Sequence, residues 1–213
     1  MIFGLVEKRR MIKPPAYLLK EAVHSYAFDR RLPDTLTRTP RILEDFLIRG
    51  KVSPTLREVV EAVVTQGSKF ADDFTQTFSE ARRVGEERNV GTPDDFEEFW
   101  SGVAAPVIVQ GLAEQHGVYD RCAERGLEGL LEVKTVRLYA TYYAAWVFAK
   151  WFGEQGVPGK VKSSERGDFF HSVQSAAADV FVTRDARLAR WLKLIPVENF
   201  EVISLDQLIE RLA

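Results

Sequence analysis

Cysteine is almost absent from this chain, because its 213 residues include only Cys122. A single cysteine cannot close an intramolecular disulfide or build a cysteine-rich zinc site. The chain must therefore take its stability from a buried core, which a length of this order can supply. The lack of disulfides fits a reducing compartment, and we expect the protein to be cytoplasmic.

Long hydrophobic runs and charge of one sign are also lacking. The longest apolar stretch, residues 138–152, is interrupted by Lys150 and is shorter than the roughly 20 residues that cross a bilayer. We therefore expect a buried helix there and no membrane partner. The formal net charge is −2, whereas nucleic-acid binders are often strongly basic. Because metal-binding carboxylates can offset a basic rim, this balance does not exclude a nuclease.

Prolines that follow Ser, Thr or Lys mark a series of helix starts. Proline suits the first helical turn, where its missing N–H would have no partner. Such starts occur at Pro14, Pro40, Pro54 and Pro93. The helical pattern continues to residue 152, and Val136–Phe152 is apolar on more than one face. We predict a helical part over residues 13–152, with Val136–Phe152 central to its core.

The pattern changes after Gly167. We predict alternating helices and strands at Asp168–Ala178, Val180–Val182, Leu188–Leu194, Phe200–Ile203 and Leu205–Leu212. Short runs of β-forming residues without polar alternation are typical of a parallel sheet. This order predicts an α/β part over residues 160–213, within one domain spanning residues 1–213.

Two aspartates flank the first predicted strand. Asp185 follows its carboxyl end, where sites form in open parallel sheets. Asp168 begins the preceding helix, and the reversal of chain direction brings that end near Asp185. We expect both carboxylates to face one Mg²⁺ or Mn²⁺ ion, which prefers oxygen ligands. Each aspartate could instead simply cap a helix, because Asp is a favoured N-cap residue.

Other polar side chains lie near these aspartates in the sequence. His171 is one helical turn from Asp168, on the same face. It could orient a water or a phosphate, or it could be a structural histidine. Thr183 and Arg184 are candidates for substrate binding, with a solvated arginine as the simpler reading of Arg184. Asp179 fits a turn residue better than a ligand.

The segment Gly167–Asp185 resembles the C-terminal half of PIN-like nuclease domains. In that family an aspartate begins a helix rich in small residues, and a hydrophobic strand follows and ends in Thr-x-Asp, here Thr183-Arg184-Asp185. The resemblance implies a small parallel sheet flanked by helices, with a large helical elaboration. It also implies a Mg²⁺- or Mn²⁺-dependent endoribonuclease whose catalytic residues are Asp168, Asp185 and His171.

The resemblance further implies partners and ligands. RNA would be the substrate, and an antitoxin or a second copy of the chain could be a protein partner if the protein is a toxin or defence component. The family's first-strand aspartate is absent, and Met1–Val6 resembles the helix that follows it, so we expect that aspartate upstream. A further glutamate ligand would be Glu21, Glu44 or Glu58.

Two alternatives remain open. The missing aspartate favours a catalytically inactive PIN-like scaffold that binds a protein partner. An α-helical interaction protein without a parallel sheet would make the C-terminal resemblance accidental.

Overall fold

The computed structural model describes residues 5–6, 10–32, 34–38, 53–55, 57–58, 61, 96–151 and 165–212. The chain divides into two compact units. Unit 1 comprises residues 1–13, 34–90 and 160–167, and unit 2 comprises residues 14–33, 91–159 and 168–213. Among the described residues, no helix is both long enough and apolar enough to cross a membrane.

Unit 1 contains an antiparallel sheet that our sequence analysis did not anticipate. Its central strand β2 (Arg10–Ile12) pairs with β1 (Leu5–Val6) and with β3 (Leu36–Arg38). The helix expected over Met1–Val6 is therefore wrong at Leu5 and Val6. Pairing with β2, which begins four residues after Val6, satisfies backbone groups of this strand, and such pairing overrides a weak local preference for helix.

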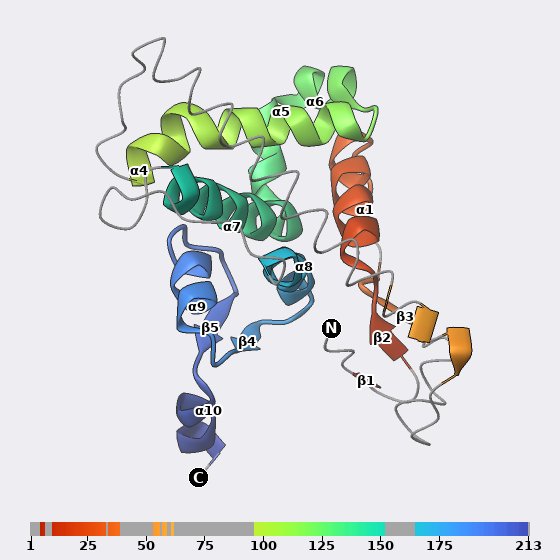
Figure 1. The fold of residues 1–213 in the computed structure, drawn as a ribbon. Helices are drawn as coiled ribbons and strands as arrows, with labels where there is room; N and C mark the ends of the chain where they lie inside the picture. Colours follow the sequence, from red (N-terminus) through yellow and green to blue (C-terminus); the bar gives the residue numbers. More distant parts are fainter. Residues whose placement is uncertain are drawn as a thin grey trace. The chain divides into compact units, whose positions relative to one another are not determined.

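The long helix α7 (Lys134–Trp151) is central to unit 2. It contacts α1 (Pro15–Ala27), α4 (Phe96–Phe99), α5 (Ala105–Gln115) and α9 (Ala186–Leu192). Figure 1 shows α7 between the α4–α5 rod and the C-terminal elements. Its fully buried side chains occur on more than one face: Val136, Leu138, Ala140, Tyr142, Ala144 and Trp146. The prediction of a central helix here is confirmed.

The first helix of unit 2 begins as its prolines indicate. Pro14 is the N-cap residue of α1, and Pro15 occupies the first helical position. Leu18, Leu19 and Val23 are buried along one side of the helix. The proline start at Pro54 also leads into helical residues, whereas Pro40 and Pro93 lie outside the described residues.

Helices α4 and α5 are joined by a π-helical segment, η1 (Trp100–Ala104). Pro106 occurs at the start of α5 and cannot donate the usual backbone hydrogen bond. A local widening of the helix is one way to accommodate such an interruption. After Gly117, which has a φ of 68°, the chain continues through α6 (Tyr119–Arg125) and the 3₁₀ segment η2 (Leu127–Glu132).

The C-terminal part alternates helices and strands. Helix α8 (Glu165–Gln174) and the short η3 (Ser175–Ala177) lead into β4 (Val180–Val182), and β5 (Glu201–Ile203) is followed by α10 (Leu205–Leu212). Strands β4 and β5 pair in parallel, with Phe181 opposite Val202. The described part of the chain is therefore mostly helical with a small parallel sheet, as the sequence predicts.

Candidate functional site

Asp168 lies inside α8 rather than at its N-cap position. The helix begins at Glu165, so Asp168 is the fourth helical residue, and the expected start at Asp168 is wrong by three residues. Glutamate is a good helix former, so its local preference agrees with a helix at Glu165. This position removes helix capping as an explanation for Asp168.

Asp185 follows β4 and is the N-cap residue of α9. Its Oδ1 accepts a hydrogen bond from the Leu188 backbone N–H at 2.9 Å. Its own backbone N–H donates to the Thr183 hydroxyl at 3.0 Å. The sequence predicted both a cap and a candidate ligand at Asp185, and it offered Thr183 as a substrate contact. In the structure, the Thr183 hydroxyl orients the Asp185 backbone.

Asp168 of α8 and Asp185 at the start of α9 interact electrostatically. Burial raises the pKa of Asp168, and the negative charge of Asp185 raises it further. Two neighbouring carboxylates repel each other, which favours the neutral form of one of them. A divalent cation between them would relieve that repulsion.

Arg187 on α9 supplies a positive charge at the same place. Its Nη2 lies 3.3 Å from Asp168 Oδ2, and this contact acts against the upward shift in the pKa of Asp168. The guanidinium carbon lies 5.1 Å from the centre of the Trp191 ring, one turn further along the helix. Arg187 is therefore held between an aromatic face and a carboxylate.

His171 also belongs to this cluster. Burial lowers its pKa, whereas the Asp168 carboxylate acts in the opposite direction. The net shift favours a neutral imidazole at neutral pH. The expectation that His171 and Asp168 share one face of the helix agrees with their electrostatic interaction.

Aromatic packing fixes the α8 backbone beside Asp168. The Phe169 ring is buried, with its centroid 5.0 Å from that of Tyr142 and 5.1 Å from that of Trp146, both on α7. Tyr142 also packs against Trp191 of α9 at 5.4 Å. One aromatic cluster thus supports both helices that carry the charged residues, so the site rests on the core of unit 2.

No contact with this cluster is found for the other predicted site residues that the structure describes in unit 2, Arg184 and Glu21. Arg184 is exposed, Glu58 is exposed in unit 1, and Glu44 lies outside the described residues. Glu21 is partly exposed on α1. Within the described ranges, no group of three or more His, Cys, Asp and Glu side chains is placed to hold a metal ion.

Arg187 was not among the site residues predicted from the sequence. Three arginines occur in α9 or just before it: Arg184, Arg187 and Arg190. Helical periodicity alone does not show which of them faces Asp168, because that depends on how α9 packs against α7 and α8. The available signal in the sequence was that Arg187 follows the candidate ligand Asp185 by two residues, which keeps a positive charge close to that carboxylate.

The donor set fits a hard divalent cation with two carboxylate ligands. Magnesium is commonly bound by one or two carboxylates, with water and substrate phosphate as the other ligands. Asp168 and Asp185 are close enough for mutual repulsion, and the cap uses only Oδ1 of Asp185. These two residues would hold the ion, with the partly buried Asp168 as the less hydrated ligand.

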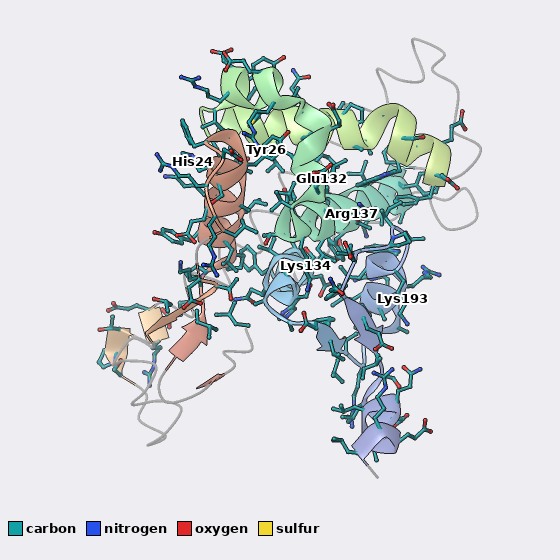
Figure 2. All side chains as sticks on the ribbon, turned by 180° about the vertical axis from the view of Figure 1, so that it is seen from behind. His24, Tyr26, Glu132, Lys134, Arg137 and Lys193 are labelled. Atoms are coloured by element: carbon teal, nitrogen blue, oxygen red, sulfur yellow. The ribbon has the colours of Figure 1, made fainter. Side chains whose placement is uncertain are left out.

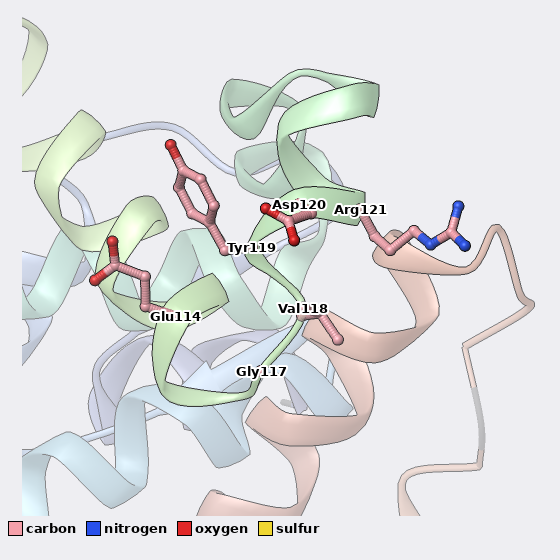
Figure 3. Close-up of a pocket in the computed structure, with 6 residues that line it drawn as sticks. All are labelled: Glu114, Gly117, Val118, Tyr119, Asp120 and Arg121. Carbon is pink, nitrogen blue, oxygen red and sulfur yellow. The ribbon is translucent and has the colours of Figure 1, made fainter.

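A separate pocket of about 460 Å³ lies where α5 meets α6. Its lining includes Glu114, Tyr119 and Asp120, and Arg121 points away from the first two (Figure 3). None of the sequence-predicted site residues lines this pocket. Arg121 instead pairs with the exposed Glu124 at 3.3 Å.

Comparisons with known proteins add no family assignment to this geometry. No protein-family model, curated protein or solved structure matches the chain. The chemistry of the cluster around Asp168 and Asp185 must therefore be inferred from its own residues.

Proposed function

We propose that the protein is a Mg²⁺- or Mn²⁺-dependent endoribonuclease of PIN-like type. The observation that carries the proposal is that Asp185, which follows the carboxyl end of β4, raises the pKa of the partly buried Asp168 of α8 through its negative charge, while Arg187 of α9 contacts the same Asp168 carboxylate at 3.3 Å. Sites in parallel α/β sheets form at this edge. Phosphodiester hydrolysis by a metal-bound water is the reaction that such carboxylates support.

Each residue of the cluster has a distinct part in this proposal. Asp168 and Asp185 would hold the metal ion, and such an ion, when bound, would supply an activated water and stabilise the developing charge. His171, whose pKa is lowered by burial, is neutral and can accept a proton from a water molecule. The exposed Arg184 contacts a backbone phosphate of the RNA.

Mn²⁺ calorimetry tests the metal site directly. The unsubstituted protein should bind Mn²⁺, and Asp168→Asn and Asp185→Asn should each weaken binding at least about tenfold, because each removes a charged ligand. Asp179→Asn is the matched control, since Asp179 is an exposed aspartate that pairs with Lys134 at 3.6 Å. Equal affinities in all four proteins would refute the proposed metal site.

RNA cleavage follows as the second measurement. A mixed oligoribonucleotide pool should be cut in the presence of Mn²⁺ by the unsubstituted protein and by Asp179→Asn, but not by Asp168→Asn. Metal binding without any cleavage would reject the nuclease activity while keeping the metal site.

A catalytically inactive PIN-like scaffold is the second candidate function. The specific observation in its favour is that the Asp168 carboxylate forms an ion pair with Arg187, a cation of the protein itself. The exposed apolar residues of α10, Ile209 and Leu212, would suit a protein partner. Absence of Mn²⁺ binding by every variant would favour this function.

A further inference from the structure

Arg187 occupies a position that matters for any cation at Asp168. The guanidinium contacts Asp168 Oδ2 at 3.3 Å, and the Asp168 side chain is 18% exposed. A metal ion arriving at Asp168 would share this confined space with a permanent positive charge. Like charges within a few ångströms repel strongly where water is partly excluded. The ion pair and the metal therefore compete for one carboxylate.

Arg187 also contacts the Trp191 ring, and this contact does not depend on the ion pair with Asp168. Its guanidinium lies over the Trp191 ring at 5.1 Å, and Trp191 is buried against Tyr142. Stacking on an indole stabilises a guanidinium independently of a carboxylate. Arg187 can thus leave Asp168 without leaving the site.

A substrate phosphate is the group that the Arg187 guanidinium would bind after it leaves Asp168. The planar fork of arginine matches a phosphate as well as it matches a carboxylate. A metal ion held by two carboxylates binds substrate through its phosphate, so that phosphate would arrive beside Arg187.

We propose that Arg187 neutralises Asp168 in the metal-free protein and passes to a substrate phosphate when a divalent cation takes Asp168. This inference rests on the proposed function. It makes Arg187 a phosphate-binding residue of the same site and sets the order of events, with metal first and RNA second.

Arg187→Met tests the competition, because methionine keeps much of the apolar volume over Trp191 and removes the charge. Calorimetry should show Mn²⁺ binding to Arg187→Met about tenfold tighter than to the unsubstituted protein, since a repulsive charge is gone. Lys193→Met removes the same charge from the exposed end of α9 and should leave the affinity unchanged. Arg187→Lys keeps the charge and guards against a folding effect, and its Mn²⁺ affinity should stay near that of the unsubstituted protein.

Binding of a short phosphorothioate oligoribonucleotide at saturating Mn²⁺ tests the phosphate contact. Arg187→Met should bind more weakly than Lys193→Met, and its affinity should depend less on salt, with the slope reduced by about one phosphate contact. Arg187→Lys should also bind more weakly, since it lacks the planar fork.

The outcomes separate this inference from the proposed function. If the unsubstituted protein binds Mn²⁺ through Asp168 but Arg187→Met binds it no more tightly, the competition is refuted and the metal site stands. Unchanged oligonucleotide binding by Arg187→Met would refute the phosphate contact. If neither protein binds Mn²⁺, the metal site itself fails, and the role of Arg187 fails with it.

Discussion

Asp185 illustrates at the scale of a single residue how one side chain can serve structure and chemistry together. Its Oδ1 caps α9 through the Leu188 N–H. Its charge also acts on Asp168 and raises the pKa of that carboxyl group. Asparagine caps a helix about as well as aspartate does, whereas alanine does not. The two roles can therefore be separated by substitution.

We predict that Asp185→Asn leaves the free energy of unfolding nearly unchanged and that Asp185→Ala lowers it by about 1 kcal/mol through loss of the cap. Both substitutions should weaken Mn²⁺ binding, because both remove the carboxylate. Urea denaturation and calorimetry on the same samples measure the two effects. If Asp185→Asn were as destabilised as Asp185→Ala, the charge rather than the hydrogen bond would stabilise the start of α9.

Lys134, the first residue of α7, shows how the elements of the C-terminal part are joined. Its Nζ donates to the carbonyl oxygens of Ala178 at 2.8 Å and Asn199 at 3.1 Å, which precede β4 and β5 (Figure 2). The ammonium also lies 5.3 Å from the centre of the Phe200 ring. One cation thus connects the helix to the entry of both strands.

We predict that Lys134→Met lowers the free energy of unfolding by about 1–3 kcal/mol, because it leaves carbonyl oxygens without their charged donor. Lys193→Met is the control, since an exposed lysine outside such a network should change stability by less than about 0.5 kcal/mol. Chemical denaturation compares the two variants. Equal stabilities would mean that water replaces the lysine without loss.

Two histidines face each other between α1 and the end of α5. The ring centroids of His24 and His116 lie 6.3 Å apart, and both Nε2 atoms are buried without a hydrogen-bond partner among the described residues. Burial lowers the pKa of His116, and the nearby His24 and Lys20 lower it further. The folded protein therefore disfavours protonation of His116.

We predict that His116 makes the protein less stable in mild acid. The folded-state pKa of His116 lies below the ordinary value of 6.5, so its contribution is fully present above that value and is lost as the pH falls through the folded pKa. Thermal denaturation at pH 7.5 and at pH 5 should show a smaller loss for His116→Gln than for the unsubstituted protein. His171 shifts in the same direction and Asp168 in the opposite one, so the difference between the two proteins is the informative quantity. Parallel pH profiles would contradict the prediction.

Across unit 2, the apolar surface is distributed unevenly. Helix α10 has apolar residues at one helical spacing, namely Leu205, Leu208, Ile209 and Leu212, but none of its residues is buried. Ile209 is 56% exposed and Leu212 is 78% exposed, while Val202 in the neighbouring strand is 4% exposed. Glu201 of that strand forms an ion pair with Arg211 of α10, which lowers the pKa of Glu201. The buried core of unit 2 therefore includes β5 but none of the side chains of α10.

We predict that Ile209→Ser and Leu212→Ser each change the free energy of unfolding by less than about 0.5 kcal/mol, because neither residue contributes to the core. Val202→Ser should cost about 2 kcal/mol or more, because it places a hydroxyl in an apolar interior. Denaturation of the three variants tests this contrast. A large loss for Leu212→Ser would place α10 within the cooperative core.

Several elements could be predicted from the sequence because their signals are local. The prolines before α1, the apolar faces of α7 and the β-forming residues of β4 and β5 each determine an element within a few residues of chain. The strand at Leu5–Val6 was not predicted, although its partner β2 begins only four residues after Val6, because the sheet is completed by β3, which lies beyond α1 in the chain. Its stability depends on pairing rather than on local preference.

In the candidate site too, some features follow from the local sequence and others only from the tertiary structure. The sequence alone determined that Asp185 would follow a strand, because a hydrophobic run followed by a capping residue is a local pattern. The expectation that this strand is buried is wrong, because Val180 is 41% exposed and no residue of β4 is buried. Only the tertiary structure decided that Arg187 reaches Asp168 across 19 positions and that Lys134 reaches the entry of both strands. Long-range charge contacts depend on how packed helices are oriented, and the alignment of α8 and α9 is set by the aromatic cluster on α7. A helix period specifies the faces of each helix, but the packing of the core decides which faces meet.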